Sequence, residues 1–457
     1  MNRRQFLACS GLMLGAGSCA TSTNPARDSR PNILVIMTDQ HAATSMSCTG
    51  NPHLNTPAMD SLAAKGVRFG RAYASQPLCM PSRSSMMAGR YPHEHGVVTN
   101  GLRYNREWPM LGKMMANVGY ECAYVGKWHV GTPMDSRHAG YSFRSEGGKD
   151  HEKAARAVGY LSREHEKPFF LTVSFVNPHN VCQLARHQPL PDGPIPPLPK
   201  NMDDLPPLPD NFAIPENEPT AIREVQEMSR GKHYPTKDWD ERLWREYLWG
   251  YNRICEKVDG EVAKVLEALQ ENGLAENTVI VYLADHGEGI AAHHWNQKQI
   301  LYDEAVRVPC LIAPPQTNAA GTVSKALVST GIDYLPTILD FAGIPCPESM
   351  PGLSLKSIAS GEAEALPREY VVSETIFASG TKQFGVSGRM LRTERYKYVI
   401  YNKGECREQL FDMEKDPGEM NNLAVDEKFL PELNRHRQLL TDWAKKTNDD
   451  FPYMDAV

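Results

Sequence analysis

After its N-terminal segment, the sequence has no apolar run long enough to cross a bilayer. It also has no surplus of basic residues, because 49 lysines and arginines stand against 55 acidic residues and give a formal net charge of -6 at pH 7. Nucleic-acid binding generally needs a basic face, so we expect no nucleic-acid partner. The length of 457 residues, with 41% hydrophobic and 23% charged residues, is ordinary for a globular enzyme.

The sequence also lacks closely spaced pairs of cysteines. Two of its ten cysteines lie in the N-terminal segment, and Cys79 is set apart by its surroundings. The others are scattered along the chain: Cys48, Cys122, Cys182, Cys255, Cys310, Cys346 and Cys406. An odd, scattered set of this kind predicts neither a disulfide framework nor a zinc knuckle. Most of these residues are expected to be small, buried and apolar in character.

Residues 1–28 are expected to be an export signal. Arg3 and Arg4 precede an apolar, glycine-rich run, and small and polar residues follow it. Twin arginines in this position are typical of the bacterial route that exports folded proteins. Cys19 follows small residues, which leaves lipid attachment there as an alternative to plain cleavage. The sequence therefore predicts a periplasmic protein or a membrane-anchored lipoprotein of a bacterium.

Short apolar runs alternate with amphipathic stretches over residues 29–366. Buried strands are expected at Asn32–Met37, at Phe169–His179 and in the segments ECAYVGKWH and TVIVYLADHGE. Helices are expected between Thr56 and Gly66 and over DGEVAKVLEALQENG. This order predicts an α/β fold with a large, mostly parallel sheet flanked by helices. Residues 367–457 read instead as short strands followed by one amphipathic helix, which predicts a smaller C-terminal α+β subdomain.

A proline-rich stretch runs from about Cys182 to Pro215 and predicts a long irregular connection. Because it follows the end of a strand, it could wall an active site. A surface loop that only covers the sheet is an equal alternative.

Polar side chains follow four of the predicted strands. Ligand sites in open α/β sheets lie beyond the carboxyl ends of the strands, so these side chains are expected to converge. They are Asp39, Gln40 and His41; Lys127 and His129; Asn177 and His179; and Asp285 and His286. Taken singly, each is more commonly a cap, a turn or a supporting residue. Together, Asp39, Gln40, Asp285 and His286 predict a divalent metal site, with Ca²⁺ favoured and Mg²⁺ or Mn²⁺ as alternatives.

The segment QPLCMPSRSSMMAGRYPHEHGV predicts a helix that begins at Cys79, with Pro81 in its first turn. A helix N-terminus offers free N–H groups to an anion, and Arg83 can fork toward a carboxylate or an anionic oxygen. These surroundings suit a nucleophile that attacks a negatively charged ester. An oxygen nucleophile would suit a hard metal better than a thiolate does. The alternative is a cysteine that simply fills the core.

The run Cys79-Met80-Pro81-Ser82-Arg83, followed by Gly89-Arg90, resembles the Cys-x-Pro-x-Arg motif of type I sulfatases, members of the alkaline phosphatase-like superfamily. The segments GYECAYVGKWHVG, NILVIMTDQH, VNPHN, ADHGE, HHWNQK and YDEAVRVPCLI are similar to further motifs of that family, in its order. RMLRTERYKY and LFDMEKDPGEMNNLA resemble its C-terminal subdomain. The resemblance thus covers nearly all of the mature chain and implies a sulfuric ester hydrolase.

The resemblance also implies roles for individual residues. A maturing enzyme, either a formylglycine-generating or an anaerobic sulfatase-maturing enzyme, would convert Cys79 to formylglycine, whose hydrate attacks sulfur. Asp39, Gln40, Asp285 and His286 would hold the metal, which the residue-79 hydroxyl also touches. Arg83, Lys127 and Lys298 would neutralise the nucleophile and the sulfate. His179 would protonate the leaving alkoxide and His129 would act as base in the second step. His41, His93, His95, His293 and His294 are expected either to line the pocket or to support it.

Two features leave alternatives open. The pairs Asp39-Gln40 and Asp285-His286 differ from the Asp-Asp and Asp-Asn pairs of many sulfatases. They resemble those of phosphonate monoester hydrolases, choline sulfatases and some polysaccharide sulfatases. A phosphonate monoester or phosphodiester hydrolase is therefore the nearest alternative, and a non-catalytic glycan-binding protein is an alternative of another class. An exported bacterial sulfatase favours a sulfated sugar or oligosaccharide as substrate.

Overall fold

The computed structural model describes residues 28–104, 108–134 and 139–452. Residues 1–27 of the predicted export signal, with Arg3, Arg4 and Cys19, lie outside the described residues. The larger sheet has eight strands in the order β4-β3-β5-β1-β6-β7-β2-β8. In chain order they are β1 (Asn32–Asp39), β2 (Val67–Tyr73), β3 (Glu121–Gly126), β4 (Phe143–Glu146), β5 (Phe169–Pro178), β6 (Thr278–Ala284), β7 (Cys310–Ala313) and β8 (Thr322–Ser329).

Strand β1 occupies the centre of this sheet and pairs in parallel with both β5 and β6. Every residue of β1 is buried, as expected for a strand that is covered on both faces. Strand β7 is the exception in direction, because it runs antiparallel to β6 and to β2. The mostly parallel sheet confirms the predicted α/β class. The ends of β1, β3, β5 and β6 meet at one edge, where the polar residues follow.

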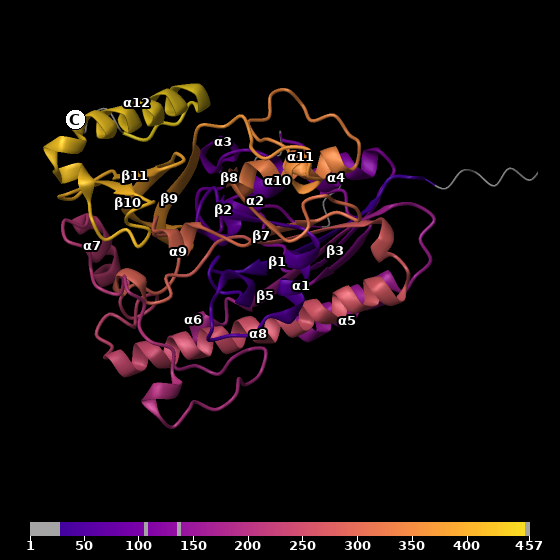
Figure 1. Cartoon of the computed structure of the whole chain (residues 1–457), viewed down its shortest axis with the longest axis horizontal. Coiled ribbons are helices and arrows are strands. Elements are labelled where there is room, and N and C mark those ends of the chain that lie inside the picture. The colour runs from indigo at the N-terminus through magenta and orange to yellow at the C-terminus, as the bar shows by residue number, and fades with distance from the viewer. Residues whose placement is uncertain (1–27, 105–107, 135–138, 453–457) are drawn as a thin grey trace, which may run out of the picture.

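Helices cover both faces of the sheet (Figure 1). On one face lie α1 (Pro57–Lys65), α5 (Asp150–Leu161) and α8 (Glu241–Glu271), which pack on side chains such as Leu34 and Ile36. On the other lie α2 (Cys79–Ala88), α4 (Leu111–Asn117), α10 (Thr330–Phe341) and α11 (Lys356–Ala359), which pack on Ile33 and Val35. Further helices are α3 (Pro92–His95), α6 (Val181–Leu184), α7 (Thr220–Met228) and α9 (Asp303–Val306).

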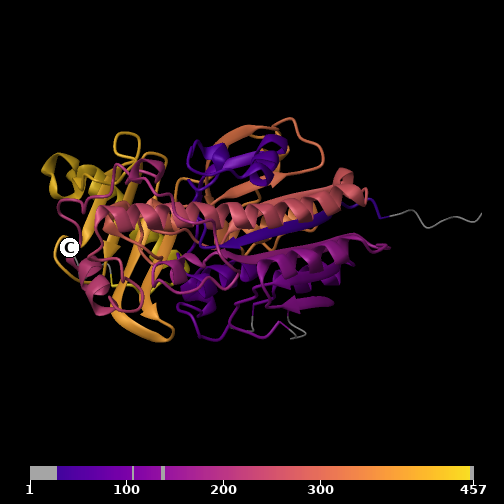
Figure 2. The ribbon, with the colours of Figure 1, turned by 90° about the horizontal axis from the view of Figure 1, so that it is seen from below.

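Helix α8 is longer than the sequence predicts. Its expected C-terminal part is present, and Gly273 follows its end, but it begins at Glu241 with Asp240 as N-cap. The carboxylate of Asp240 accepts a hydrogen bond from Leu243 N at 2.9 Å. Aromatic side chains such as Trp244 bury the N-terminal part of the helix. Figure 2 shows α8 running along almost the whole length of the sheet.

The proline-rich connection between α6 and α7 is irregular, as predicted, and much of it lies over α8. The guanidinium of Arg245 donates to the carbonyls of Met202, Leu205 and Pro206. The ammonium of Lys257 donates to Asp192 O at 2.5 Å. These contacts favour the covering role for the middle of this segment. At its start, Cys182 of α6 contacts Gln40 and Gln297.

A second sheet of four antiparallel strands forms the C-terminal part of the chain. It contains β9 (Val371–Ser379), β10 (Lys382–Arg392), β11 (Tyr396–Tyr401) and β12 (Glu408–Asp412), and α12 (Leu430–Thr447) packs on it. Strand β9 is joined to the loop before α2 because Glu374 N donates to Ser75 O at 2.8 Å. Figure 1 shows this sheet and α12 at one end of the molecule. The second sheet therefore reaches the segment that carries Cys79.

The cysteines of the described chain are all free thiols. Cys122, Cys182, Cys255 and Cys310 are buried, and Cys406 is exposed. The absence of disulfides among the described residues agrees with the prediction from cysteine spacing. Within the same residues, we find no helix that has the length and apolar character of a membrane span.

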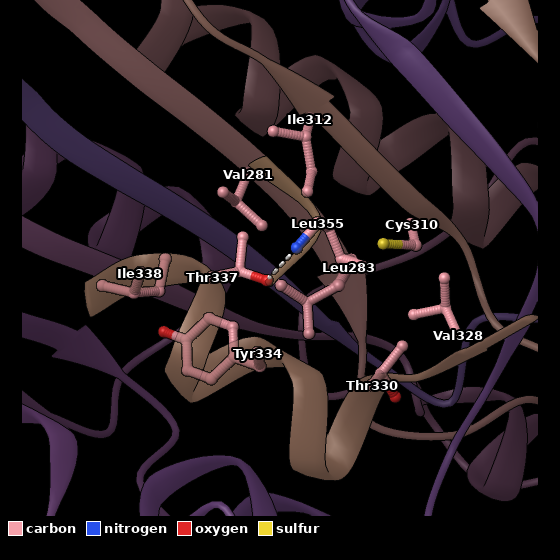
Figure 3. A pocket seen from close by; sticks show the side chains of 10 residues that line it. All are labelled: Val281, Leu283, Cys310, Ile312, Val328, Thr330, Tyr334, Thr337, Ile338 and Leu355. Atoms are coloured by element: carbon pink, nitrogen blue, oxygen red, sulfur yellow. Dashed lines mark hydrogen bonds between the residues drawn. The ribbon is translucent and has the colours of Figure 1, made fainter. Parts of the chain in front are cut away.

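A small cavity lies between β6, β7, β8 and α10 (Figure 3). Its lining is mainly aliphatic, with Tyr334, Cys310 and two threonines as the polar exceptions. The hydroxyl of Thr337 already accepts a hydrogen bond from Leu355 N at 3.0 Å. No charged side chain lines the cavity, so it is a gap in core packing and offers no chemistry.

Candidate active site

Cys79 is the first residue of α2 and is almost completely buried. Its sulfur lies 3.0 Å from Lys298 Nζ and 3.2 Å from His286 Nε2. Burial alone would raise the pKa of the thiol, but the charges of Lys127, Lys298 and His286 lower it well below its usual value. A core cysteine has no such surroundings. The geometry therefore favours the reactive interpretation of Cys79.

The predicted metal ligands converge on Cys79. Asp39, Cys79, Asp285 and His286 each offer one atom, and these atoms all lie within 4.8 Å of one another. Asp39 is the last residue of β1 and Asp285 directly follows β6, so the parallel pairing of these strands brings the two carboxylates together. All four side chains are buried. Two carboxylates and an imidazole that face one point fit a divalent cation.

The ring of His286 is oriented by its own backbone. Its Nδ1 lies 2.9 Å from the carbonyl oxygen of Gly287, a contact that places the ring proton on Nδ1. Nε2 is then directed toward Cys79 and Asp285, from whose Oδ1 it lies 3.6 Å. Burial lowers the pKa of this ring, but Asp285 and Cys79 raise it by more, so a cation bound at Nε2 would take the place of a proton there.

Gln40 has a less direct position than the other predicted ligands. Its backbone adopts φ +66°, and its N–H donates to Asp285 Oδ1 at 3.1 Å. Its side-chain oxygen accepts from Lys298 Nζ at 3.0 Å, and its Nε2 donates to Glu288 at 2.5 Å. The amide oxygen therefore lies beside the cluster, in contact with a cation that also touches Cys79.

The guanidinium of Arg83 donates hydrogen bonds to two carboxylates, a backbone carbonyl and a serine hydroxyl. Nε donates to Asp285 Oδ2 at 2.7 Å, and Nη2 donates to Asp39 Oδ2 at 3.2 Å. Nη1 donates to Lys127 O and to Ser174 Oγ, both at 2.8 Å. The sequence left open whether Arg83 contacts a carboxylate or another anionic oxygen. The structure shows contacts with two carboxylates. Arg83 therefore joins the side chains of the two predicted metal ligands, Asp39 and Asp285.

The remaining predicted residues surround the sulfur of Cys79 on its open side. Lys127 forms an ion pair with Asp39, and both His129 and His179 interact with the Cys79 sulfur. His129 and His179 are half-buried, unlike the metal cluster beneath them. Burial and the charge of Lys298 lower the pKa of His179. The two histidines therefore stand between the buried cluster and solvent.

Glu288 is a supporting residue that sequence reasoning missed. This buried carboxylate accepts hydrogen bonds at 2.5 Å from Tyr247 Oη, Gln40 Nε2 and Gln297 N. Burial raises its pKa. Its position three residues after Asp285, in the run ADHGE, was the available signal. Glu288 fixes both Gln40 and the loop that carries Lys298.

The additional histidines support the site or lie apart from it. His41 is buried against Ser45 O and Tyr282 Oη, at 2.7 Å and 3.0 Å. His95 contacts Ser85, His93 pairs with Glu374, and His294 contacts Lys237 O. These contacts favour the supporting alternative for these four residues.

His293 belongs to a separate polar cluster with Glu304 and Glu419. Lys397 already pairs with Glu419 at 2.6 Å and with Asp303 at 2.9 Å. Burial raises the pKa of Glu419 to about 8. This cluster is accordingly an internal ion-pair network that joins α9 to the C-terminal sheet.

Comparison with known proteins agrees with this geometry. Residues 31–344 match the family model described as "Sulfatase", and residues 291–446 match "N-sulphoglucosamine sulphohydrolase, C-terminal". The chain is 33% identical to a Δ4,5-hexuronate-2-O-sulfatase of Bacteroides thetaiotaomicron, over 92% of this chain and 90% of that protein.

Two solved structures extend the comparison. A 2-O GAG sulfatase superposes with a TM-score of 0.83 at 32% identity, covering 92% of this chain and 93% of the other. The phosphonate monoester hydrolase of Agrobacterium radiobacter superposes with a TM-score of 0.74 at 20% identity, covering 92% of this chain and 96% of the other. The latter likeness is one of fold alone.

Proposed function

This chain belongs to the sulfatase family and is a sulfuric ester hydrolase; on that premise we propose that it removes sulfate from acidic, glycosaminoglycan-type sugars, with formylglycine formed from Cys79 as nucleophile. The observation that carries the catalytic part is the placement of the Cys79 sulfur, 3.0 Å from Lys298 and 3.2 Å from His286, beside two buried carboxylates. The relative that acts on a sulfated hexuronate supports the substrate class.

The donor set fits a divalent cation held by Asp39, Asp285 and His286, with residue 79 and Gln40 beside it. The negative charge of two carboxylates favours Ca²⁺, and the imidazole keeps Mg²⁺ and Mn²⁺ as alternatives. Bound there, the cation would polarise a sulfate oxygen, while the formylglycine hydrate would supply an oxygen nucleophile. Arg83, which donates hydrogen bonds to both carboxylates, would keep them oriented toward the cation.

The remaining residues act on charge and protons. Lys127 and Lys298 would bind the sulfate oxygens and stabilise the charge that shifts in the transition state. His179, on the open side of the site, would donate a proton to the oxygen of the leaving sugar. His129, also beside residue 79, would accept a proton from the residue-79 hydroxyl when sulfate departs. Splitting the displacement in two steps lowers each barrier.

A substrate panel tests this proposal. Sulfate release would be measured on sulfated unsaturated uronate disaccharides, on sulfated hexosamines and on 4-nitrophenyl sulfate, next to a phenyl phosphonate and a phosphodiester. We expect kcat/KM to be highest on a uronate sulfate. Faster turnover of the phosphonate or the phosphodiester than of every sulfate would favour the alternative hydrolase. Binding of the disaccharides without turnover, by protein that carries formylglycine, would favour the glycan-binding alternative.

The proposal includes export by a bacterium. Residues 1–28 would direct the folded chain across the membrane, and Cys19 would be either removed with the signal or lipidated. Export of a folded chain would let the maturing enzyme act on Cys79 in the cytoplasm beforehand. Cell fractionation of the full chain and of Cys19→Ala distinguishes the two fates: only a lipidated protein leaves the membrane fraction when Cys19 is replaced.

A further inference from the structure

A group of basic residues lies on segments that contact the loop carrying Lys298. Arg186 follows α6, and Lys232 and His233 lie in the connection between α7 and α8. Arg186 Nε donates to Lys232 O at 2.8 Å, and Lys232 Nζ donates to Ser379 Oγ at 2.8 Å. Among the described residues, neither cation forms an ion pair with a carboxylate. Their positive charges are therefore not neutralised within this part of the protein.

Hydrogen bonds tie this basic group to the loop that carries Lys298. Asn296 Nδ2 donates to His233 O at 3.1 Å, and Asn296 Oδ1 accepts from Thr236 Oγ1 at 2.6 Å. Asn296 stands two residues before Lys298, whose ammonium touches Cys79. On the other side, Gln299 Nε2 donates to Ala378 O at 3.1 Å, next to the serine that Lys232 contacts. The segments that carry Lys232 and Lys298 therefore border one another.

Arg186 is tied to the site through α6. Cys182, one helical turn before Arg186, has its sulfur 3.4 Å from Gln40 Nε2 and 3.0 Å from Gln297 Nε2. The pKa of His233 reflects cations from both regions. Burial lowers it most, and the charges of Lys232, Arg186 and Lys298 lower it again, to about 4. Arg186, Lys232 and Lys298 carry like charges, which repel one another. Binding of a further anion would offset that repulsion.

We propose that Arg186 and Lys232, with His233 beside them, form a second anion subsite that binds another acidic group of the sulfated sugar. The chemistry that fits is a uronate carboxylate or a second sulfate on the same oligosaccharide, because Arg and Lys bind both through charge-assisted hydrogen bonds. This inference rests on the proposed function and adds the group by which the enzyme selects its substrate. Sulfate release takes place at Cys79, and the second subsite holds the sugar in register.

The experiment compares Arg186→Gln and Lys232→Gln with Arg242→Gln, an exposed arginine of α8 that pairs with Glu246. The probes are a 2-O-sulfated unsaturated uronate disaccharide, its carboxyl-reduced form, a disulfated form and 4-nitrophenyl sulfate. We expect each subsite variant to raise KM by about 10- to 100-fold on probes that carry the second anion, with little change in kcat. The loss on 4-nitrophenyl sulfate should be less than about twofold, and Arg242→Gln should match the wild type on every probe.

The carboxyl-reduced probe identifies which anion is bound. If reduction removes the advantage of the wild type over Arg186→Gln, the subsite binds carboxylate; if only the disulfated probe responds, it binds sulfate. Equal losses on 4-nitrophenyl sulfate and on the acidic disaccharides, or no loss on any probe, would overturn the subsite while sulfatase activity stood. Should the wild type release no sulfate, calorimetric binding of the disaccharide to wild type and to Arg186→Gln still decides. Unchanged affinity there would overturn the subsite, whereas weakened binding to the variant would support it.

Discussion

The guanidinium of Arg83 donates from Nε to Oδ2 of Asp285 at 2.7 Å, and both side chains are almost fully excluded from solvent. A second donor of the same group reaches Asp39, so one arginine joins the two carboxylates of the cluster. We therefore propose that Arg83 positions the predicted metal ligands. The ammonium groups of Lys127 and Lys298 remain as the cations that face residue 79 and the incoming sulfate.

Arg83→Gln should weaken metal binding by about 10- to 100-fold, because the carboxylates lose the partner that orients them. The same change should lower the free energy of unfolding by roughly 3–5 kcal/mol, since two buried carboxylates lose their counter-charge. Chelator competition with Ca²⁺, Mg²⁺ and Mn²⁺ measures the first effect and denaturant titration the second. Arg90→Gln, in the loop after the same helix, should keep wild-type metal affinity. Unchanged affinity in Arg83→Gln would contradict the positioning role.

Cys79 should be present as formylglycine in active protein. The tryptic peptide Ala72–Arg83 should therefore have the mass of an aldehyde in place of the thiol, and Cys79→Ala should abolish sulfate release. Ser85→Ala, in the same helix but in contact with His95, serves as the control and should retain conversion. Full turnover by protein that carries only the unmodified thiol would show that the proposed nucleophile is wrong.

His179→Ala should slow sugar sulfates far more than aryl sulfates. A sugar alkoxide is a poor leaving group and needs a proton as the S–O bond breaks, whereas a nitrophenolate does not. General acid catalysis contributes about 10²–10⁴-fold, so kcat/KM on a sulfated glycan should fall by roughly that factor. Steady-state kinetics on both substrates measure the difference. An equal loss on both would make His179 a sulfate-binding residue instead.

The pairing of His93 with Glu374 at 2.7 Å should make stability depend on pH. Burial lowers the pKa of His93, but the carboxylate of Glu374 raises it by a larger amount. The net result is a pKa of about 9. Because an unfolded histidine titrates near pH ~6.5, the pair stabilises the fold fully below that pH and loses its effect as the pH rises through about 9. Its contribution should be about 1–3 kcal/mol.

Denaturant titrations between pH 6 and 10 test this dependence. We expect the unfolding free energy of the wild type to fall over that window, and His93→Gln to reduce the slope. His436→Gln is the matched control, because burial lowers the pKa of His436 and its titration affects acid stability only. A wild-type slope preserved in His93→Gln would contradict the assignment.

Sequence alone predicts that the candidate metal ligands converge, because the pairing of parallel strands fixes where they lie. Once Asp39 and Asp285 are placed after neighbouring buried strands, their side chains must share an edge of the sheet. The orientation of Gln40 could not be predicted in the same way. It depends on a positive φ and on Glu288, which is 248 residues away in the chain.

Other features were missed for similar reasons. The start of α8 at Glu241 escaped prediction because aromatic residues there pack under a proline-rich segment that has no periodic pattern of its own. Arg83 presented two chemically equal partners, and only the tertiary contacts distinguish them. Arg186 and Lys232 lie in separate connections between helices, so no single sequence motif contains both. The sequence therefore predicts side-chain positions that the pairing of adjacent strands determines. It does not predict contacts between loops that are far apart in the chain.

The contact between the C-terminal sheet and Gln299 has a consequence for how the gene can change. Thr375 Oγ1 donates to Gln299 O at 2.5 Å, and Ala378 N donates to Gln299 Oε1 at 2.7 Å, next to Lys298. A premature stop codon before β9 would leave the whole larger sheet encoded, yet the loop that carries Lys298 would lose its brace. Recombination that exchanges C-terminal parts between homologous genes would likewise have to preserve this contact. We therefore expect the gene segments that encode the larger sheet and the C-terminal sheet to be inherited together.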